Sequence, residues 1–308
     1  MHALISRREY SKIMSKYIVL KEIMTLLLTD YLERNARLYG LETALVEINP
    51  SEERDQATTW RDMNLIESAN PDAPYRREMS WAEFDRRANK FANLLLSRGV
   101  ERGTKVSILL MNCLEWLPIY FGILKAGCIA VPMNFRYSSE EIKYCLDLAD
   151  VDVLVFGPEF VSRMDAIADE IKLHFTFYVG KNGPTYTEDC IRLMGFCSTS
   201  APPVALCETD HAAIYFSSGT TGFPKAILHN HRALAYSCEV EQNHHGQSRE
   251  DVFLCIPPLY HTGAKMHWFG SLLSASKAVL LRGVKPEWTQ RSSLIIKSGG
   301  IRIDRPTP

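Results

Sequence analysis

The sequence lacks a long uninterrupted apolar segment. A membrane-spanning helix needs roughly 20 consecutive apolar residues, and the best candidate, residues 18–28, is interrupted by Lys21 and Glu22. The N-terminal stretch also lacks the small-x-small cleavage site of a secretory signal peptide. We therefore predict no integral membrane segment and no targeting peptide.

An excess of charge of either sign is also missing. The 308 residues include 35 Lys and Arg against 36 Asp and Glu, which gives a formal net charge of −1. Proteins that bind nucleic acid usually carry a basic excess, so we predict no nucleic-acid partner. Hydrophobic residues make up 46% of the chain, which supports one large globular domain or two ordinary ones.

Cysteine pairs at redox or zinc spacing are absent. The eight cysteines include no C-x-x-C pair, and no histidine stands beside them at the spacing of a zinc site. The histidines of residues 229–231 and 244–245 lack a third ligand at a suitable spacing. We predict no metal centre in the protein, and we interpret the cysteines as reduced, mostly buried thiols of a cytoplasmic protein.

Strand-like and helix-like segments alternate along most of the chain. Ser80 followed by Glu83 is typical of a capping box at the start of a helix that Gly99 ends. The alternation predicts an α/β fold with mostly parallel sheets flanked by helices. Strands are expected over residues 105–111, 128–132, 151–156, 174–179, 212–216, 226–228, 252–256 and 278–281, and helices over residues 80–99, 114–125, 138–149, 159–171, 231–243 and 264–273.

Other segments are expected to lie at the surface or to be irregular. Residues 50–79 are polar and contain three prolines, which predicts an exposed excursion, and residues 181–210 read as an irregular linker. The arginine pairs at 76–77 and 86–87 are interpreted as solvated. Trp116 and Tyr120 stand one helical turn apart and are expected in the core.

The most informative segment is residues 215–225, Y-F-S-S-G-T-T-G-F-P-K. A loop rich in Ser, Thr and Gly after a buried strand offers backbone N–H groups and hydroxyls that suit a phosphate. It is not a Walker A loop, because its glycines and Lys225 do not have the G-x-x-x-x-G-K-[ST] spacing. From composition alone, a Ser/Thr/Gly-rich hairpin turn is an equal alternative.

The same string resembles the signature loop of the adenylate-forming (AMP-dependent synthetase/ligase) superfamily, and most of all its acyl-CoA synthetases. Ala226 departs from that pattern, because glycine is usual at this position. Residues 79–132 resemble the core of the family's N-terminal subdomain, and I-P-P-L-Y-H-T at 256–262 resembles its next motif. The loop residues that match are Ser217, Ser218, Gly219, Thr220, Thr221, Gly222, Pro224 and Lys225.

This resemblance implies the acyl-CoA synthetase/luciferase-like fold and a two-step activity. An acid would react with ATP and Mg²⁺ to give an acyl-adenylate, and coenzyme A would then displace AMP. The resemblance implies phosphate binding by residues 217–222 and catalytic roles for Lys225 and His261. It also points to three residues lining the acyl pocket, namely Thr262, Gly263 and Met266.

The resemblance also suggests boundaries. Residues 24–288 are interpreted as a partial AMP-binding domain. Residues 1–23 are interpreted as an upstream extension, with a short native helix as the alternative. Residues 289–308 do not resemble the family, which suggests a change of reading frame near Trp288, with a genuine end as the alternative. We expect the family's small C-terminal domain to be absent and thioester formation by this fragment to be blocked.

Two other functions stay open at this point. One is an adenylation domain that serves a carrier protein, and the other is a non-catalytic remnant that binds nucleotide. The sequence does not specify the acid or the oligomeric state.

Overall fold

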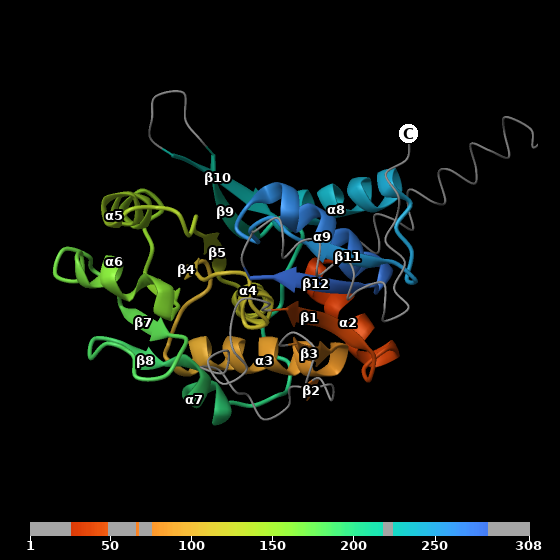
Figure 1. Cartoon of the computed structure of the whole chain (residues 1–308), viewed down its shortest axis with the longest axis horizontal. Coiled ribbons are helices and arrows are strands. Elements are labelled where there is room, and N and C mark those ends of the chain that lie inside the picture. The colour runs from red at the N-terminus through yellow and green to blue at the C-terminus, as the bar shows by residue number, and fades with distance from the viewer. Residues whose placement is uncertain (1–25, 49–65, 68–75, 218–223, 283–308) are drawn as a thin grey trace, which may run out of the picture.

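The computed structural model describes residues 26–48, 66–67, 76–217 and 224–282, with the side chains of residues 264–267 left out (Figure 1). Its larger sheet has the strand order β10-β9-β5-β4-β6-β7-β8. The strand pairs of this sheet are parallel except for the antiparallel pair of β9 and β10. The strands are β4 (Lys105–Leu109), β5 (Ile129–Pro132), β6 (Val153–Phe156), β7 (Phe175–Tyr178), β8 (Glu188–Asp189), β9 (His211–Ser217) and β10 (Lys225–Asn230).

A second sheet has the order β11-β12-β1-β3-β2. Its strands β1 and β11 both pair parallel with β12, while β3 runs antiparallel to β1 and β2. The sheet therefore joins segments from both ends of the described chain. The strands are β1 (Thr43–Ile48), β2 (Ile66–Glu67), β3 (Arg76–Ser80), β11 (Val252–Cys255) and β12 (Lys277–Leu281).

Helices flank both sheets, and α2, α3, α4 and α9 lie around the region where the sheets meet (Figure 1). The helices are α2 (Leu28–Leu38), α3 (Trp81–Ser97), α4 (Trp116–Lys125), α5 (Ser139–Leu148), α6 (Val161–Asp165), α7 (Cys190–Gly195), α8 (His231–His245) and α9 (Thr262–Ser274), with a 3-10 turn at Pro158–Phe160. Within the described residues, none of these helices has the length and apolar character to cross a bilayer. The α/β fold class predicted from the sequence is confirmed.

One hydrophobic core serves both sheets. Its buried residues include Leu45 and Ala278 from the smaller sheet and Val106 and Ala130 from the larger one. The core is rich in aromatic contacts, such as the edge-to-face pair of Phe84 and Phe121 at 5.5 Å between ring centroids. The core positions predicted for Trp116 and Tyr120 are confirmed. Six of the eight cysteines are buried, as expected; Cys197 is half-buried and Cys207 is exposed.

Two interpretations of charged residues were wrong. Residues 76–79 belong to strand β3 and not to an exposed excursion, and Arg77 and Met79 on it are buried. Arg87 is also buried, because its Nε donates to Glu83 Oε1 at 2.7 Å. The Ser80 cap is confirmed, since Ser80 Oγ accepts from the Glu83 N–H at 3.3 Å.

The predicted helix over 159–171 is too long. The segment begins as a 3-10 turn, α6 ends at Asp165, and turns follow. Ile167 is still buried, so the apolar spacing reported burial and not helix. The 181–210 segment is less irregular than expected, because it contains β8 and α7. The proposed boundaries at 23 and 288 fall outside the described residues.

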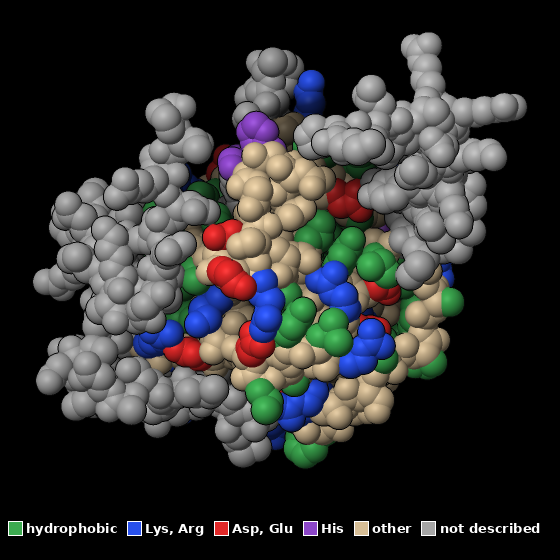
Figure 2. All heavy atoms as spheres, turned by 90° about the vertical axis from the view of Figure 1, so that its right-hand side faces the viewer, with side chains coloured by type: hydrophobic (Ala, Val, Ile, Leu, Met, Phe, Trp, Pro, Cys, Tyr) green, Lys and Arg blue, Asp and Glu red, His purple; other side chains and the backbone are tan. Residues whose placement is uncertain are grey.

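On the face shown in Figure 2, Lys and Arg side chains alternate with Asp and Glu side chains across the described surface. Several of these charges form exposed ion pairs, such as Arg249 with Glu42 and Arg102 with Asp210. The mixture matches the near-neutral composition of the chain.

Candidate active site

The Ser/Thr/Gly-rich loop connects two antiparallel strands. Ser217 at the end of β9 pairs in register with Lys225 at the start of β10, so the predicted strand at 226–228 is confirmed. Directly opposed residues project on the same face of a sheet, which places the Lys225 side chain on the side of Ser217. Lys225 is exposed there and Ser217 is half-buried. Five predicted phosphate-binding residues lie outside the described residues, namely Ser218, Gly219, Thr220, Thr221 and Gly222.

A hollow of about 610 Å³ lies beside this hairpin. It is bordered by β9 and β10, by the segment after β5 and by the turn before α9. Both β5 and β9 approach it with their carboxyl ends, the edge at which open α/β sheets bind ligands. The lining residues are Pro132, Asn134, Tyr137, Glu141, Tyr215, Phe216, Ser217, Pro224, Ile227, His229, Tyr260, His261 and Thr262.

His261 lies at the wall of the hollow and caps α9. Its backbone N–H donates to Pro258 O at 3.0 Å, and its Nδ1 accepts from the Gly263 N–H at 3.2 Å. A neutral imidazole that accepts at Nδ1 carries its proton on Nε2. His261 is exposed, so this geometry leaves an N–H donor available to an anion.

The other predicted pocket residues have different fates. Thr262 lines the hollow next to His261, whereas Gly263 does not and acts as the donor to His261 Nδ1. The Met266 side chain lies outside the described residues. Lys225 is not among the lining residues and stands at the end of β10 beside Pro224, which is.

Sequence reasoning missed the aromatic side of the hollow. The hydroxyls of Tyr215 and Tyr120 are 2.6 Å apart in the core, and burial raises the pKa of both phenols above their ordinary value. The rings of Tyr215 and His229 meet edge to face at 5.5 Å. A signal was available, because Tyr215 and Ser217 share a strand face by period-2 alternation.

Arg163 fixes the wall formed by the segment after β5. Its Nη1 donates to Phe135 O at 2.6 Å and to Tyr137 O at 3.1 Å. The Phe135 ring then meets Tyr260 edge to face at 5.2 Å. This contact joins the wall to the turn that carries His261, and nothing in the local sequence pattern indicated it.

No group of three or more His, Cys, Asp or Glu side chains in the part of the chain that the structure describes could hold a metal ion. The carboxylate that lines the hollow, Glu141, accepts from the Ser138 N–H at 2.8 Å and is engaged in a capping box. The described site therefore offers hydroxyl, imidazole and backbone donors, which suit an anion.

Comparison with known proteins places the chain in a family. Residues 52–300 match the model of the AMP-binding enzymes. The chain belongs to the AMP-binding enzyme family. The resemblance to acyl-CoA synthetases seen in the loop and in the 256–262 motif is thereby confirmed.

Named relatives of this AMP-binding protein are CoA ligases. It is 30% identical over 192 residues to crotonobetaine/carnitine–CoA ligase of Citrobacter koseri, covering 60% of this chain and 37% of that protein. It is 28% identical over 259 residues to a long-chain-fatty-acid–CoA ligase of Thermus thermophilus, covering 82% of this chain and 42% of that one. The chain thus spans less than half the length of these curated relatives.

The fold is shared with a solved structure. A long-chain-fatty-acid–CoA ligase from Archaeoglobus fulgidus superposes with a TM-score of 0.74 at 19% identity, covering 90% of this chain and 50% of that one. At this identity the likeness shows the fold alone. The described part of the chain therefore has the N-terminal architecture of the acyl-CoA synthetase/luciferase-like fold.

Proposed function

We propose that this chain carries the phosphate- and carboxylate-binding side of an acid–CoA ligase. In the first step, a carboxylate oxygen would attack the α-phosphorus of ATP, which arrives with Mg²⁺, and the bond to pyrophosphate breaks. In the second step, the thiol of coenzyme A would attack the acyl carbon and AMP leaves. The observation that carries the proposal is the β9–β10 hairpin loop beside the hollow that His261 borders.

The chemistry requires two anions to approach each other while charge grows on the leaving pyrophosphate. Positioned hydrogen-bond donors and fixed positive charge supply most of the stabilisation in such reactions. Lys225 and the hydroxyls of the loop supply these on one side of the hollow. On the other side, the Nε2–H of His261 can donate to an oxygen of the acid or of the adenylate.

Lys225→Ala tests the loop. We expect the Kd for Mg-ATP to rise by about tenfold, because a hydrogen bond to a charged group contributes roughly 1.5–3 kcal/mol. Isothermal titration calorimetry measures this on the 308-residue chain. Lys181→Ala is the matched control, since Lys181 is also exposed and lies in the turn after β7, toward the opposite edge of the sheet. Equal affinities of the two variants would contradict the proposal.

A second measurement separates this function from the alternatives. Acid-dependent exchange of labelled pyrophosphate into ATP reports adenylation, and the later transfer of the acyl group to coenzyme A or to a carrier protein reports the acceptor. Nucleotide binding without acid-dependent exchange would favour a non-catalytic binding module. A folded chain that does not bind ATP would overturn both readings.

A further inference from the structure

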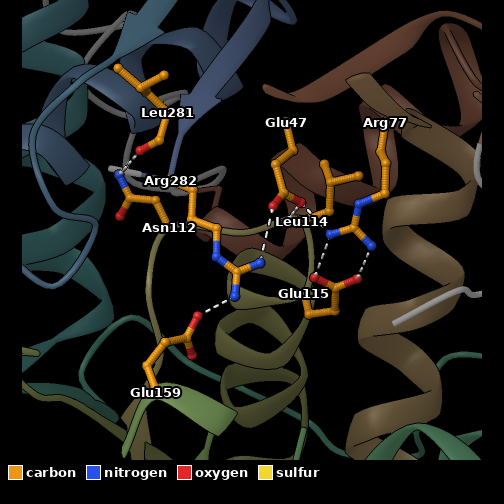
Figure 3. A network of polar contacts seen from close by, with 8 residues as sticks. All are labelled: Glu47, Arg77, Asn112, Leu114, Glu115, Glu159, Leu281 and Arg282. Carbon is orange, nitrogen blue, oxygen red and sulfur yellow. Dashed lines mark hydrogen bonds and ion pairs between the residues drawn. The ribbon is translucent and has the colours of Figure 1, made fainter. Parts of the chain in front are cut away.

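Asn112 is a buried side chain that bonds three backbone atoms of distant segments (Figure 3). Its Nδ2 donates to Pro257 O at 3.0 Å and to Leu281 O at 3.2 Å. Its Oδ1 accepts from the Leu259 N–H at 2.8 Å. A primary amide has two N–H donors and one carbonyl oxygen, so both donors and the acceptor atom are in use. No other side chain of this size offers that combination.

The atoms that Asn112 binds flank the turn that presents His261. The bond from the His261 N–H to Pro258 O closes a four-residue turn. Asn112 holds the residue before and the residue after Pro258, namely Pro257 and Leu259. Because prolines have no N–H, the backbone at this point has few bonds of its own with which to hold the turn.

The segment that carries Asn112 is itself anchored to the smaller sheet. The Leu114 N–H donates to Glu47 Oε2 at 3.1 Å, and Glu115 Oε1 accepts from Arg77 Nη1 at 3.1 Å. Arg77 also pairs with Glu47 (Figure 3). All three charged side chains are buried. The segment after β4 is therefore a fixed reference point, and Asn112 transmits that position to the turn.

We propose that Asn112 is a positioning residue that sets the place of the 258–261 turn and, with it, the direction of the His261 side chain at the hollow. It does not touch the hollow, because it is absent from the residues that line it. The consequence for chemistry rests on the proposed function. The structural part of the proposal stands apart from it.

Histidine labelled with ¹³C at Cε1 allows the first test by NMR. The His261 signal is identified by its loss in His261→Gln. We expect the signal to move by more than its linewidth in Asn112→Ala and in Asn112→Asp. The aspartate keeps an acceptor for Leu259 but turns a second oxygen toward two carbonyls, so it removes both donated bonds with almost no change of shape.

Asn89→Ala is the matched control. Asn89 is as buried as Asn112, at 3% exposure, and its Nδ2 also donates to a distant carbonyl, Thr199 O, at 3.0 Å. Thr199 is not among the residues that line the hollow. We expect this variant to lose stability without moving the His261 signal. An unmoved signal in both Asn112 variants, each with native circular dichroism, would overturn the proposal.

Two further readouts do not depend on that comparison. In the unaltered chain, the Leu259 amide should exchange with D₂O as slowly as amides in β12, even if the Asn112 variants fail to fold. Exchange at the rate of an open loop would contradict the assignment.

For pyrophosphate exchange, we expect the Asn112 variants to lower kcat by about tenfold or more with little change in the KM for ATP, because misplacement of a catalytic group acts on the transition state. Equal losses in kcat for the Asn89 control and the Asn112 variants would reduce Asn112 to a structural role. If the unaltered chain shows no exchange, the proposed function fails while the NMR and amide measurements still test Asn112.

Discussion

At the scale of single residues, the charges that matter most to this fold are those that water does not reach. Arg77 is 1% exposed and lies between Glu47 and Glu115, so one guanidinium is shared by two buried carboxylates. Arg282 extends the network by pairing with Glu159, and its Nη1 lies 3.7 Å from Glu47 (Figure 3). The network joins strands of the smaller sheet to the segments that follow β4 and β6.

Removal of Arg77 should therefore be costly. We expect Arg77→Ala to lower the free energy of unfolding by about 3–5 kcal/mol, because it leaves two buried carboxylates without their partner. Arg86→Ala is the comparison, since Arg86 pairs with Glu83 but its side chain is 48% exposed, and it should cost less than about 1 kcal/mol. Urea unfolding followed by tryptophan fluorescence measures both. Similar losses in the two variants would show that burial does not govern these pairs.

At the scale of elements, the local pattern predicted most strands and helices correctly where burial and period agree. The helix beginning after Ser138 has the expected capping box, and α8 begins at the expected His231. The pattern failed at β3, where a strand of alternating polarity contains a buried arginine that only its distant partners explain. It also failed after Asp165, where turns bury Ile167.

Close packing of α3 against α4 depends on a position without a side chain. A Cβ at Gly122 would stand 2.7 Å from Ala88 O and 2.8 Å from Phe91 Cβ. We expect Gly122→Ala to lower the free energy of unfolding by about 1–3 kcal/mol, since the two helices must separate to admit a methyl group. Gly195→Ala, at the end of α7, meets nothing within 4 Å and should be nearly neutral. Urea denaturation decides between these expectations, and a stabilised Gly122→Ala would refute them.

At the scale of the whole molecule, the site is assembled from segments far apart in the sequence. The β9–β10 loop and the 256–262 motif could be predicted because each is a local string with a recognisable order. The contribution of Asn112, Arg163 and Tyr137 could not, because it consists of contacts between segments that no local pattern links. The shared core also means that a local change is expected to register in the unfolding of both sheets.

His231 provides such a change through pH. It is 1% exposed at the start of α8, and its Nδ1 has no hydrogen-bond partner among the described residues. Burial lowers the pKa of His231 to about 4, although Asp210 opposes the shift. The unfolded chain binds a proton near pH 6.5, at which the folded chain does not. The stabilising effect of the neutral imidazole is therefore complete above pH 6.5 and is lost as the pH falls toward 4.

We expect this linkage to remove about 3 kcal/mol of stability between those two pH values. Other carboxylates titrate in the same range, so the informative quantity is the difference between the unaltered chain and His231→Gln. That difference in the free energy of unfolding, measured in urea at several pH values, should change in favour of the variant as the pH falls from 7 to 4. His211→Gln controls for the loss of an exposed histidine. Parallel pH curves for the unaltered chain and His231→Gln would mean that the imidazole is protonated or hydrated in the folded protein.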